Sequence, residues 1–115
     1  MSSSQYACYF FINKRLNMGK GKCCSQTAHG MRYLQEELIF QSSYVSEVWK
    51  KWENEGGRTI VLYANNEKEM EEIHNSYPSV KVYDAGHTQV SSNSFTVLAL
   101  YPKFHDPNEF KNKLV

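Results

Sequence analysis

One stretch of the sequence combines residue types that could bind an anion and transfer a proton. It is MGKGKCCSQTAHG, residues 18–30, in which two Gly-Lys pairs precede Gln26 and His29. Glycines let a backbone approach a ligand closely, and the free N–H groups at a helix N-terminus attract phosphate. Gln26 and His29 are three residues apart and would share one face of a helix. The stretch therefore predicts an anion-binding helix start beside an imidazole that can act as an acid or a base.

Each part of this stretch also has a simpler interpretation. A Gly-Lys loop is often only a flexible basic turn, and a single histidine on a helix is often a half-buried structural residue. Lys22 is the sharper of the two lysine candidates, because it falls in the first turn of the predicted helix. A Walker A P-loop is excluded, since Leu16 stands where that motif needs its first glycine and Cys23 follows the Gly-Lys pair. The sequence thus argues against a nucleoside triphosphatase.

A second polar segment, DAGHTQ at residues 84–89, could supply a carboxylate to the same site. Asp84 ends a predicted strand and is followed by a small Ala-Gly turn and by Thr88, whose hydroxyl could contact a substrate. A lysine nearby would keep Asp84 ionised, so that it could orient a water molecule or a protonated partner but could not act as an acid. The alternative is an Asx-type turn, which Asp and Gly often form.

Positive charge is concentrated at one end of the chain. Residues 1–35 contain no Asp or Glu, although the whole 115-residue chain has a net charge of only +1. The basic residues of this segment are Lys14, Arg15, Lys20, Lys22 and Arg32. This distribution favours a local anion-binding surface over a generally sticky polycation, and a solvated basic face is the simpler alternative.

Length and composition predict one domain over residues 1–115 with a single core, of which residues 1–4 are expected to be frayed. Three cysteines, with no C-x-x-C pair, argue against a disulfide framework and against a structural zinc site. No apolar run approaches the roughly 18 residues of a membrane span, and the start of the chain does not resemble a signal peptide. We therefore expect a cytoplasmic protein without a membrane association.

Periodicity predicts strands that alternate with helices. Strands are expected at 6–13, 59–64, 80–84 and 95–101. Helices are expected at 21–41, at 44–52, after an Asn66 N-cap, and from Asp106-Pro107 to the end of the chain, with the proline at the first helical position. The apolar stripe of the first helix is expected to comprise Ala28, Met31, Leu34, Leu38 and Ile39. This order predicts an α/β fold in which helices cover a sheet.

The predicted topology places the two polar segments at one edge of that sheet. The first two strands and the helices between them form a βαβ unit, whose strands should be parallel with a right-handed crossover. Ligands of such sheets bind beyond the carboxyl ends of the strands. The basic loop at 14–22 leaves the carboxyl end of the first strand, and Asp84 lies at that of the third. If these strands point the same way, the loop and Asp84 meet in one crevice.

Taken together, the motifs resemble the peptidyl-tRNA hydrolase 2 family, of the archaeal and eukaryotic type. The pattern is MGKGK-x-x-x-Q-x-x-H, followed about 55 residues later by DAG-x-TQ and then by TVL on a strand. The resemblance spans essentially the whole chain, and the two motifs in this order are specific although either alone would be weak. It implies a mixed four-stranded sheet with helices on both faces, a homodimer, and hydrolysis of the ester between a peptide and the 3′ ribose of tRNA, without a metal or an organic cofactor.

The resemblance also implies roles for individual residues. Its catalytic positions fall on Lys22, His29, Asp84 and Thr88. We expect Asp84 to orient the attacking water with help from Thr88 and His29, and Lys22 to stabilise the oxyanion or the ribose leaving group. The residues expected to hold the tRNA or the substrate are Lys14, Arg15, Lys20, Gln26, Arg32, His87 and Gln89. Binding to the tRNA backbone would be independent of sequence and would weaken with salt.

The chain departs from the family pattern at several positions. Arg15 replaces a usual Asp, His87 replaces the Arg of DAG-Arg-Thr-Gln, and Gly30 replaces an Ala. The changes at Arg15 and His87 could be one compensated exchange of charge, an altered substrate preference or a loss of activity. Two alternatives to a hydrolase follow: a non-catalytic tRNA- or RNA-binding module on the same fold, and a protein-interaction role for the face that carries Trp49 and Trp52.

Overall fold

The computed structural model describes residues 5–85 and 93–113 of the chain. Its elements are β1 (Tyr6–Asn13), η1 (Lys14–Leu16), α1 (Lys20–Glu37), η2 (Leu38–Phe40), α2 (Ser43–Asn54), β2 (Thr59–Ala64), α3 (Glu67–Ser76), β3 (Ser79–Tyr83), β4 (Phe95–Leu100), β5 (Lys103–Phe104) and η3 (Lys111–Lys113). Three residues to which the sequence assigned roles, His87, Thr88 and Gln89, lie outside the described residues.

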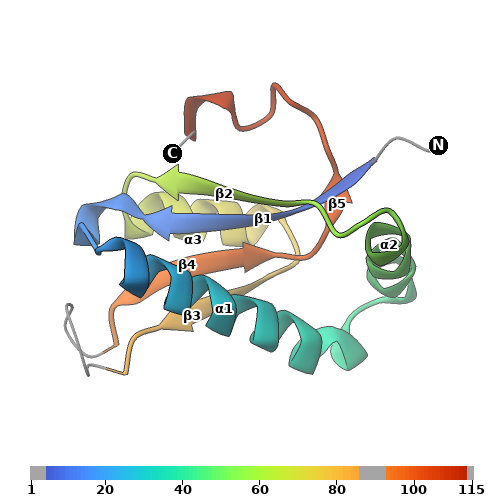
Figure 1. Cartoon of the computed structure of the whole chain (residues 1–115), viewed down its shortest axis with the longest axis horizontal. Coiled ribbons are helices and arrows are strands. Elements are labelled where there is room, and N and C mark those ends of the chain that lie inside the picture. Colours follow the sequence, from blue (N-terminus) through green and yellow to red (C-terminus); the bar gives the residue numbers. More distant parts are fainter. Residues whose placement is uncertain (1–4, 86–92, 114–115) are drawn as a thin grey trace.

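The strands form one mixed sheet with the order β2-β1-β4-β3, and β5 adds a short pairing to the start of β1 (Figure 1). β1 and β2 are parallel, whereas β4 is antiparallel to both β1 and β3. Consequently β1, β2 and β3 all point the same way, and their carboxyl ends lie at one edge of the sheet. The predicted α/β class, the mixed sheet and the parallel β1–β2 unit are confirmed.

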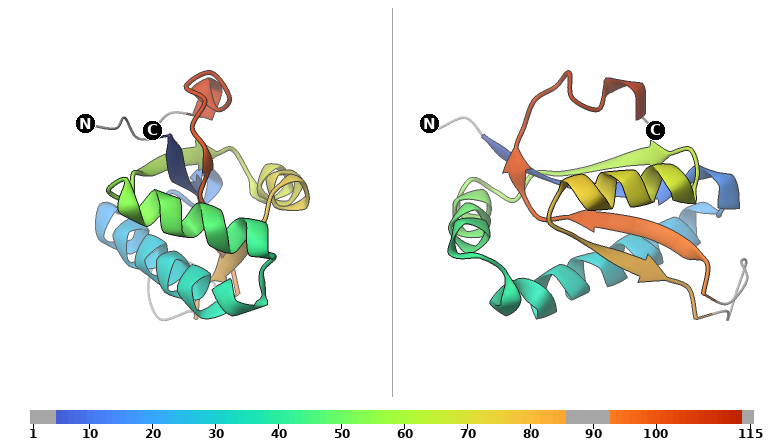
Figure 2. Two further views of the ribbon diagram at one scale, coloured as in Figure 1. Left: turned by 90° about the vertical axis from the view of Figure 1, so that its right-hand side faces the viewer. Right: turned by 180° about the vertical axis from the view of Figure 1, so that it is seen from behind.

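Helices cover both faces of the sheet. In Figure 1, α1 crosses the near face over β4 and β3, and α2 stands at the end where β1 begins. The view from behind in Figure 2 shows α3 alone across the opposite face. β1 supplies side chains to both sides because successive residues of a strand alternate: Phe10 belongs to the cluster under α1 and α2, and Phe11 to the cluster under α3.

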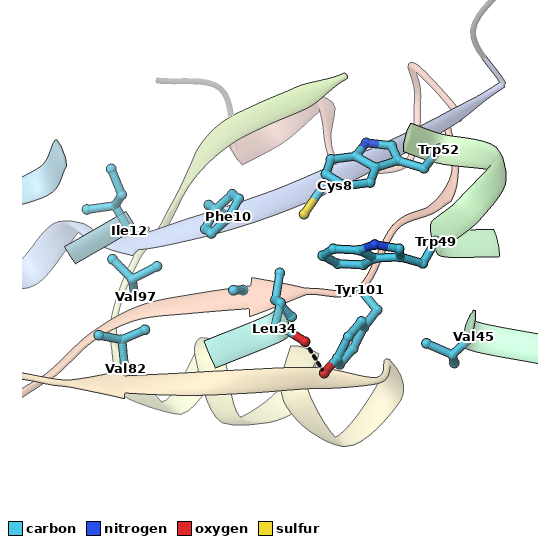
Figure 3. Close-up of a cluster of buried hydrophobic side chains, with 11 residues drawn as sticks. Cys8, Phe10, Ile12, Leu34, Val45, Trp49, Trp52, Val82, Val97 and Tyr101 are labelled. Carbon is cyan, nitrogen blue, oxygen red and sulfur yellow. Dashed lines mark hydrogen bonds between the residues drawn. The ribbon is translucent and has the colours of Figure 1, made fainter. Parts of the chain in front are cut away.

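The core under α1 and α2 contains both tryptophans. Trp49 and Trp52 of α2 are 5% and 6% exposed and pack against each other with ring centroids 5.0 Å apart (Figure 3). Tyr101, which follows β4, packs on Trp49 and donates its hydroxyl to the backbone carbonyl of Leu34 at 2.9 Å. Both indole rings are therefore part of the core and do not form an exposed binding face.

The helix predicted from Asp106 to the end of the chain is wrong. The short strand β5 (Lys103–Phe104) ends before this segment, and the described residues of the segment, 106–113, contain only the 3-10 turn η3. So short a helix is only marginally stable by itself, and tertiary contacts decide the conformation instead. Phe110 packs edge-on against Tyr9, Phe11 and Tyr77, with centroids 5.0, 5.1 and 5.9 Å away. This aromatic anchor ties the segment to the sheet in an irregular path.

Helix α1 also differs from its predicted form. It begins at Lys20 and ends at Glu37, where a 3-10 turn replaces the last predicted turn. Of the expected apolar stripe, Leu34 is fully buried, but Ala28 is exposed and Ile39 is 82% exposed. Close packing falls instead at Gly30, where a Cβ atom would lie only 3.0 Å from the ring of Phe10. The missing side chain lets α1 approach β1 closely.

Candidate active site

The centre of the site is a buried ion pair between Lys22 and Asp84. Lys22 Nζ contacts Asp84 Oδ1, and the two side chains are only 8% and 3% exposed. Lys22 is the third residue of α1, and Asp84 directly follows β3. Because β1 and β3 point the same way, the start of α1 and the end of β3 lie at the same edge of the sheet. The predicted meeting of the basic loop with Asp84 is thereby confirmed.

The backbone around Asp84 is fixed by the neighbouring strand. The N–H of Asp84 donates to the carbonyl of Ser94 at 2.9 Å, and the N–H of Asn93 donates to the carbonyl of Asp84 at 2.8 Å. These bonds extend the β3–β4 pairing beyond the end of both strands. The carboxylate is therefore held by a rigid part of the sheet, as precise catalytic positioning requires.

The charges at the start of α1 oppose helix stability. The positive end of a helix dipole favours acidic residues in the first turn and disfavours cations. The first turn of α1 contains Lys20 and Lys22 and no acidic residue, and its N-cap, Gly19, makes no side-chain capping bond. Lys20 is exposed at this positive helix start, where it can attract an anion, whereas the charge of Lys22 faces Asp84.

Gln26 joins α1 to the sheet one turn after Lys22. Its side chain is buried, and its Oε1 accepts a hydrogen bond of 2.6 Å from the hydroxyl of Thr96 in β4. The same hydroxyl lies 3.1 Å from the carbonyl of Val82 in β3. Residues four apart on a helix lie one above the other, so this bond fixes the part of α1 that places Lys22. Gln26 is thus placed to hold Lys22 in position.

Asn13 holds the start of the basic loop. It is 4% exposed at the end of β1, and its Nδ2 donates to the carbonyl of Phe95 in β4 at 2.9 Å. Its Oδ1 accepts a bond of 3.2 Å from the backbone N–H of Arg15. The sequence analysis assigned no role to Asn13 or Thr96. The feature that could have indicated a role for Asn13 is its position as a polar residue at the end of an apolar strand. For Thr96 it is its place in the TVL motif.

His29 lies apart from the ion pair. It is exposed and stacks on Tyr33, with ring centroids 6.4 Å apart and planes inclined by 18°. Seven residues of α-helix span about 10 Å, so His29 is displaced by about that distance from Lys22 along the axis of α1. Gln26 and His29 therefore differ in environment although they are three residues apart. The amide of Gln26 is in the core, and the imidazole of His29 faces solvent.

The other predicted tRNA-binding cations lie on the surface. Lys14, Arg15 and Lys20 are exposed around the carboxyl edge of the sheet, and Lys14 Nζ lies 5.6 Å from the ring centroid of Tyr63. Arg32 is 59% exposed further along α1, with its guanidinium 5.1 Å from the ring centroid of Tyr33. The structure thus groups three of the four cations beside the buried pair and places Arg32 farther along the helix.

Two of the three cysteines are poor nucleophiles. Burial raises the pKa of the Cys8 thiol to about 12. Burial, with a smaller contribution from Cys24, raises the pKa of Cys23 as well. Since the thiolate is the reactive form, neither Cys8 nor Cys23 is suited to attack a substrate at neutral pH.

Over residues 5–85 and 93–113, no three His, Cys, Asp or Glu side chains gather in a way that could hold a metal ion. In that same part of the chain, every helix is too short or too polar to cross a membrane.

Comparisons with known proteins show the family to which the chain is similar. The model of the family described as Peptidyl-tRNA hydrolase PTH2 matches residues 6–109. The chain is 34% identical over 102 residues to a protein named peptidyl-tRNA hydrolase from Methanococcus vannielii, a match that covers 83% of this chain and 84% of the relative. A protein of the same name from Methanococcus maripaludis strain C7 is 37% identical over 99 residues, covering 80% of this chain and 81% of the relative. A probable peptidyl-tRNA hydrolase 2 from Dictyostelium discoideum is 35% identical over 96 residues, which cover 79% of this chain and 44% of the relative.

Proposed function

Because the chain belongs to the peptidyl-tRNA hydrolase PTH2 family, we propose that it hydrolyses the ester bond between a peptide and the 3′ ribose of tRNA. The observation that carries this proposal is the Lys22–Asp84 pair, buried at the carboxyl edge of the sheet and bordered by exposed cations. Ester hydrolysis needs an oriented water and a stabilised oxyanion. A carboxylate and an ammonium held together in a rigid frame can meet both needs.

In the proposed reaction, Asp84 orients a water molecule toward the carbonyl carbon of the ester. The water oxygen bonds to that carbon, and the negative charge that develops on the carbonyl oxygen is stabilised by the ammonium of Lys22. The bond from the carbon to the 3′ oxygen of the ribose then breaks. One proton of the water is passed to the departing ribose oxygen, so that tRNA leaves with a free hydroxyl. The second proton is released to solvent, so that the peptide leaves as a carboxylate.

The remaining predicted residues are assigned to substrate binding or positioning. Thr88 is proposed to donate its hydroxyl near the ester, and exposed His29 to contact the substrate from α1. We assign the tRNA backbone to the four exposed cations Lys14, Arg15, Lys20 and Arg32, and contact with the substrate to His87 and Gln89. Gln26, which is buried and bonded to Thr96, is assigned to the support of α1 and not to direct contact with the substrate. Contacts to phosphates would make binding weaken steeply as salt is added.

A homodimer that acts in the cytoplasm is part of the same proposal. The surface that supports a dimer is an apolar group at the junction of η2 and α2, formed by Ile39, Phe40 and Tyr44, which are 82%, 78% and 71% exposed. Large apolar side chains so exposed and so close together are typical of contact surfaces. Sedimentation of the wild type and of Phe40→Glu tests this: a dimer that becomes a monomer in the variant supports it, and a monomeric wild type contradicts it.

The experiment that tests the function measures release of free tRNA from N-acetyl-aminoacyl-tRNA. Wild type is compared with Asp84→Asn and Lys22→Ala, and with Lys103→Ala, which removes a lysine distant from the site. We expect turnover by wild type and by Lys103→Ala, and a loss of at least about 100-fold in kcat/KM for the two site variants, the size typical of a lost oxyanion contact. Binding of tRNA without cleavage by the wild type would contradict the proposal.

A further inference from the structure

A hollow lies beside the proposed active site, between the start of α1 and the outer part of β2. Its volume is about 400 Å³, within the range of small-molecule sites. The residues that line it are Ile12, Met18, Lys20, Cys23, Cys24, Thr27, Val61 and Tyr63. It exists because α1 crosses the sheet over β4 and β3, which leaves the same face of β2 without a helix at this end (Figure 1). Val61 on that face is 38% exposed, whereas Leu62 on the α3 face is 2% exposed.

The walls of this hollow are mostly apolar. Aliphatic, sulfur-containing and aromatic groups form most of its lining, Lys20 adds one charged group, and two of its polar groups are bonded within the chain. The hydroxyl of Thr27 lies 3.0 and 2.8 Å from the carbonyls of Cys23 and Cys24, and the thiol of Cys23 points to the carbonyl of Met18 at 3.7 Å. A nucleotide base needs several hydrogen-bond partners along its edge, and a lining that is mostly apolar offers few of them. Apolar side chains need none.

The hollow and the ion pair lie on two sides of the same helix start. Cys23, in the wall of the hollow, is next to Lys22 in the chain. An α-helix with its side chains is about 10 Å across, and an extended peptide rises about 3.4 Å per residue. A peptide whose esterified residue lies at Lys22 and Asp84 would therefore reach the hollow with the second and third residues before the ester.

We propose that this hollow binds apolar side chains of the peptide, at the second and third positions counted from the ester. The inference rests on the proposed hydrolase function and adds to it a substrate preference. A neighbouring hollow of about 260 Å³ shares four wall residues with the first and adds the polar Asn13, Lys14 and Asn17. That polar extension suits the peptide backbone and the beginning of the tRNA, while the apolar hollow holds the side chains.

The test uses two synthetic substrates that differ only in those positions. N-acetyl-Leu-Leu-Gly-tRNA and N-acetyl-Gly-Gly-Gly-tRNA have the same esterified glycine and the same tRNA. We expect kcat/KM of the wild type to be about tenfold higher for the leucine substrate, the size of the effect of a few methylenes in an apolar pocket. Equal kcat/KM values for the two substrates would overturn the inference while leaving the hydrolase function intact.

Two variants locate the preference in the hollow. Val61→Asp places a charge in its wall, and Thr27→Trp fills it from α1. Both are expected to abolish the tenfold preference and to leave hydrolysis of the glycine substrate within about twofold of wild type. The matched control is Thr59→Asp, an exposed position on the same face of β2 outside the lining, which should retain the preference. An equal loss for both substrates in the two hollow variants would overturn the inference, since it points to contact with the tRNA.

A measurement on the wild type alone gives an independent check. The product N-acetyl-Leu-Leu-Gly, added to the reaction, should inhibit hydrolysis at a concentration about tenfold lower than N-acetyl-Gly-Gly-Gly does. Equal inhibition by the two peptides would contradict the proposed hollow. Failure of the wild type to cleave either tRNA substrate would instead remove the hydrolase function, and with it this inference.

Discussion

Ion pairs on the two faces of the sheet serve different purposes. On the α1 face, Lys22 and Asp84 are 8% and 3% exposed at the edge where three strands end. On the α3 face, Lys113 and Glu69 are 23% and 22% exposed, 2.7 Å apart, and link the last turn of the described chain to α3. The second pair fastens a peripheral segment in contact with water. The first is enclosed by protein.

The difference indicates why the buried pair is present. Taking two charges out of water costs several kcal/mol, and the same space filled with apolar side chains is often as stable or more stable. Lys22 also lies in the first turn of α1, where the helix dipole disfavours a cation. Both features oppose stability, and both provide an ammonium and a carboxylate held where substrate can be cleaved. We propose that this pair is kept for chemistry and the Lys113–Glu69 pair for attachment.

Breaking the buried pair from one side should give the largest change in stability. Asp84→Asn leaves the buried Lys22 ammonium without this counter-charge, and Lys22→Met removes the ammonium that faces the buried carboxylate. We expect each to lower the free energy of unfolding by about 3–5 kcal/mol, because an uncompensated buried charge is costly. Urea unfolding at pH 7 measures this change. A loss below about 1 kcal/mol in both variants would mean that the pair is effectively in water, contrary to its burial.

The hydrogen bond that supports the buried pair should matter next. Thr96→Val removes the hydroxyl and leaves the buried Oε1 of Gln26 without that donor. We expect a loss of about 1–3 kcal/mol, the cost of an unsatisfied buried polar group. Thr96→Val/Gln26→Leu removes both partners and should lose less than the single variant, which urea unfolding of the two proteins would show. A larger loss of unfolding free energy in the double variant would instead indicate that the packing of the Gln26 side chain contributes more to stability than its hydrogen bond.

The half-buried Lys113–Glu69 pair should give the smallest effect. Burial by itself would raise the pKa of Glu69, but hydrogen bonds from Lys113 and Asn65 outweigh it and hold the pKa below its ordinary value. The stability that this carboxylate adds is therefore present above its unfolded-state pKa and is lost as pH falls through the lowered folded-state pKa. Lys113→Met should cost at most about 1 kcal/mol at pH 7.

The contribution of the Lys113–Glu69 pair to the free energy of unfolding should depend on pH. Between pH 6 and pH 3, the free energy of unfolding of Lys113→Met should fall less than that of wild type, because the variant has less of this contribution to lose. Acid titration of both proteins, followed by urea unfolding at each pH, measures the difference. A steeper decline in Lys113→Met would contradict the assigned role of the pair.

The central part of the site could be predicted from sequence because topology determined it. The basic loop follows β1 and Asp84 follows β3, so the shared direction of the two strands was enough to bring Lys22 to Asp84. The supporting bonds could not be predicted in this way. Asn13 and Thr96 act through partners in other elements, and a single polar residue in an apolar strand does not reveal which partner it will find.

The end of the chain was predicted less well, for the opposite reason. Asp106 and Pro107 form a favourable local start for a helix, and local preference was the only signal available. The structure replaces that helix by a path fixed through Phe110, whose aromatic partners come from β1 and from the residue after α3. Similarly, α1 approaches β1 at Gly30 because of the Phe10 ring opposite it, a contact that periodicity does not show.

The most direct test of the account compares activity at matched stability. In the double variant Lys22→Met/Asp84→Asn neither charge is left buried and unpaired, so its free energy of unfolding should return to within about 1 kcal/mol of wild type. We predict that this folded protein binds tRNA as wild type does but releases free tRNA from N-acetyl-aminoacyl-tRNA at least about 100-fold more slowly in kcat/KM. Cleavage within about threefold of wild type would contradict the claim that the pair is kept for chemistry.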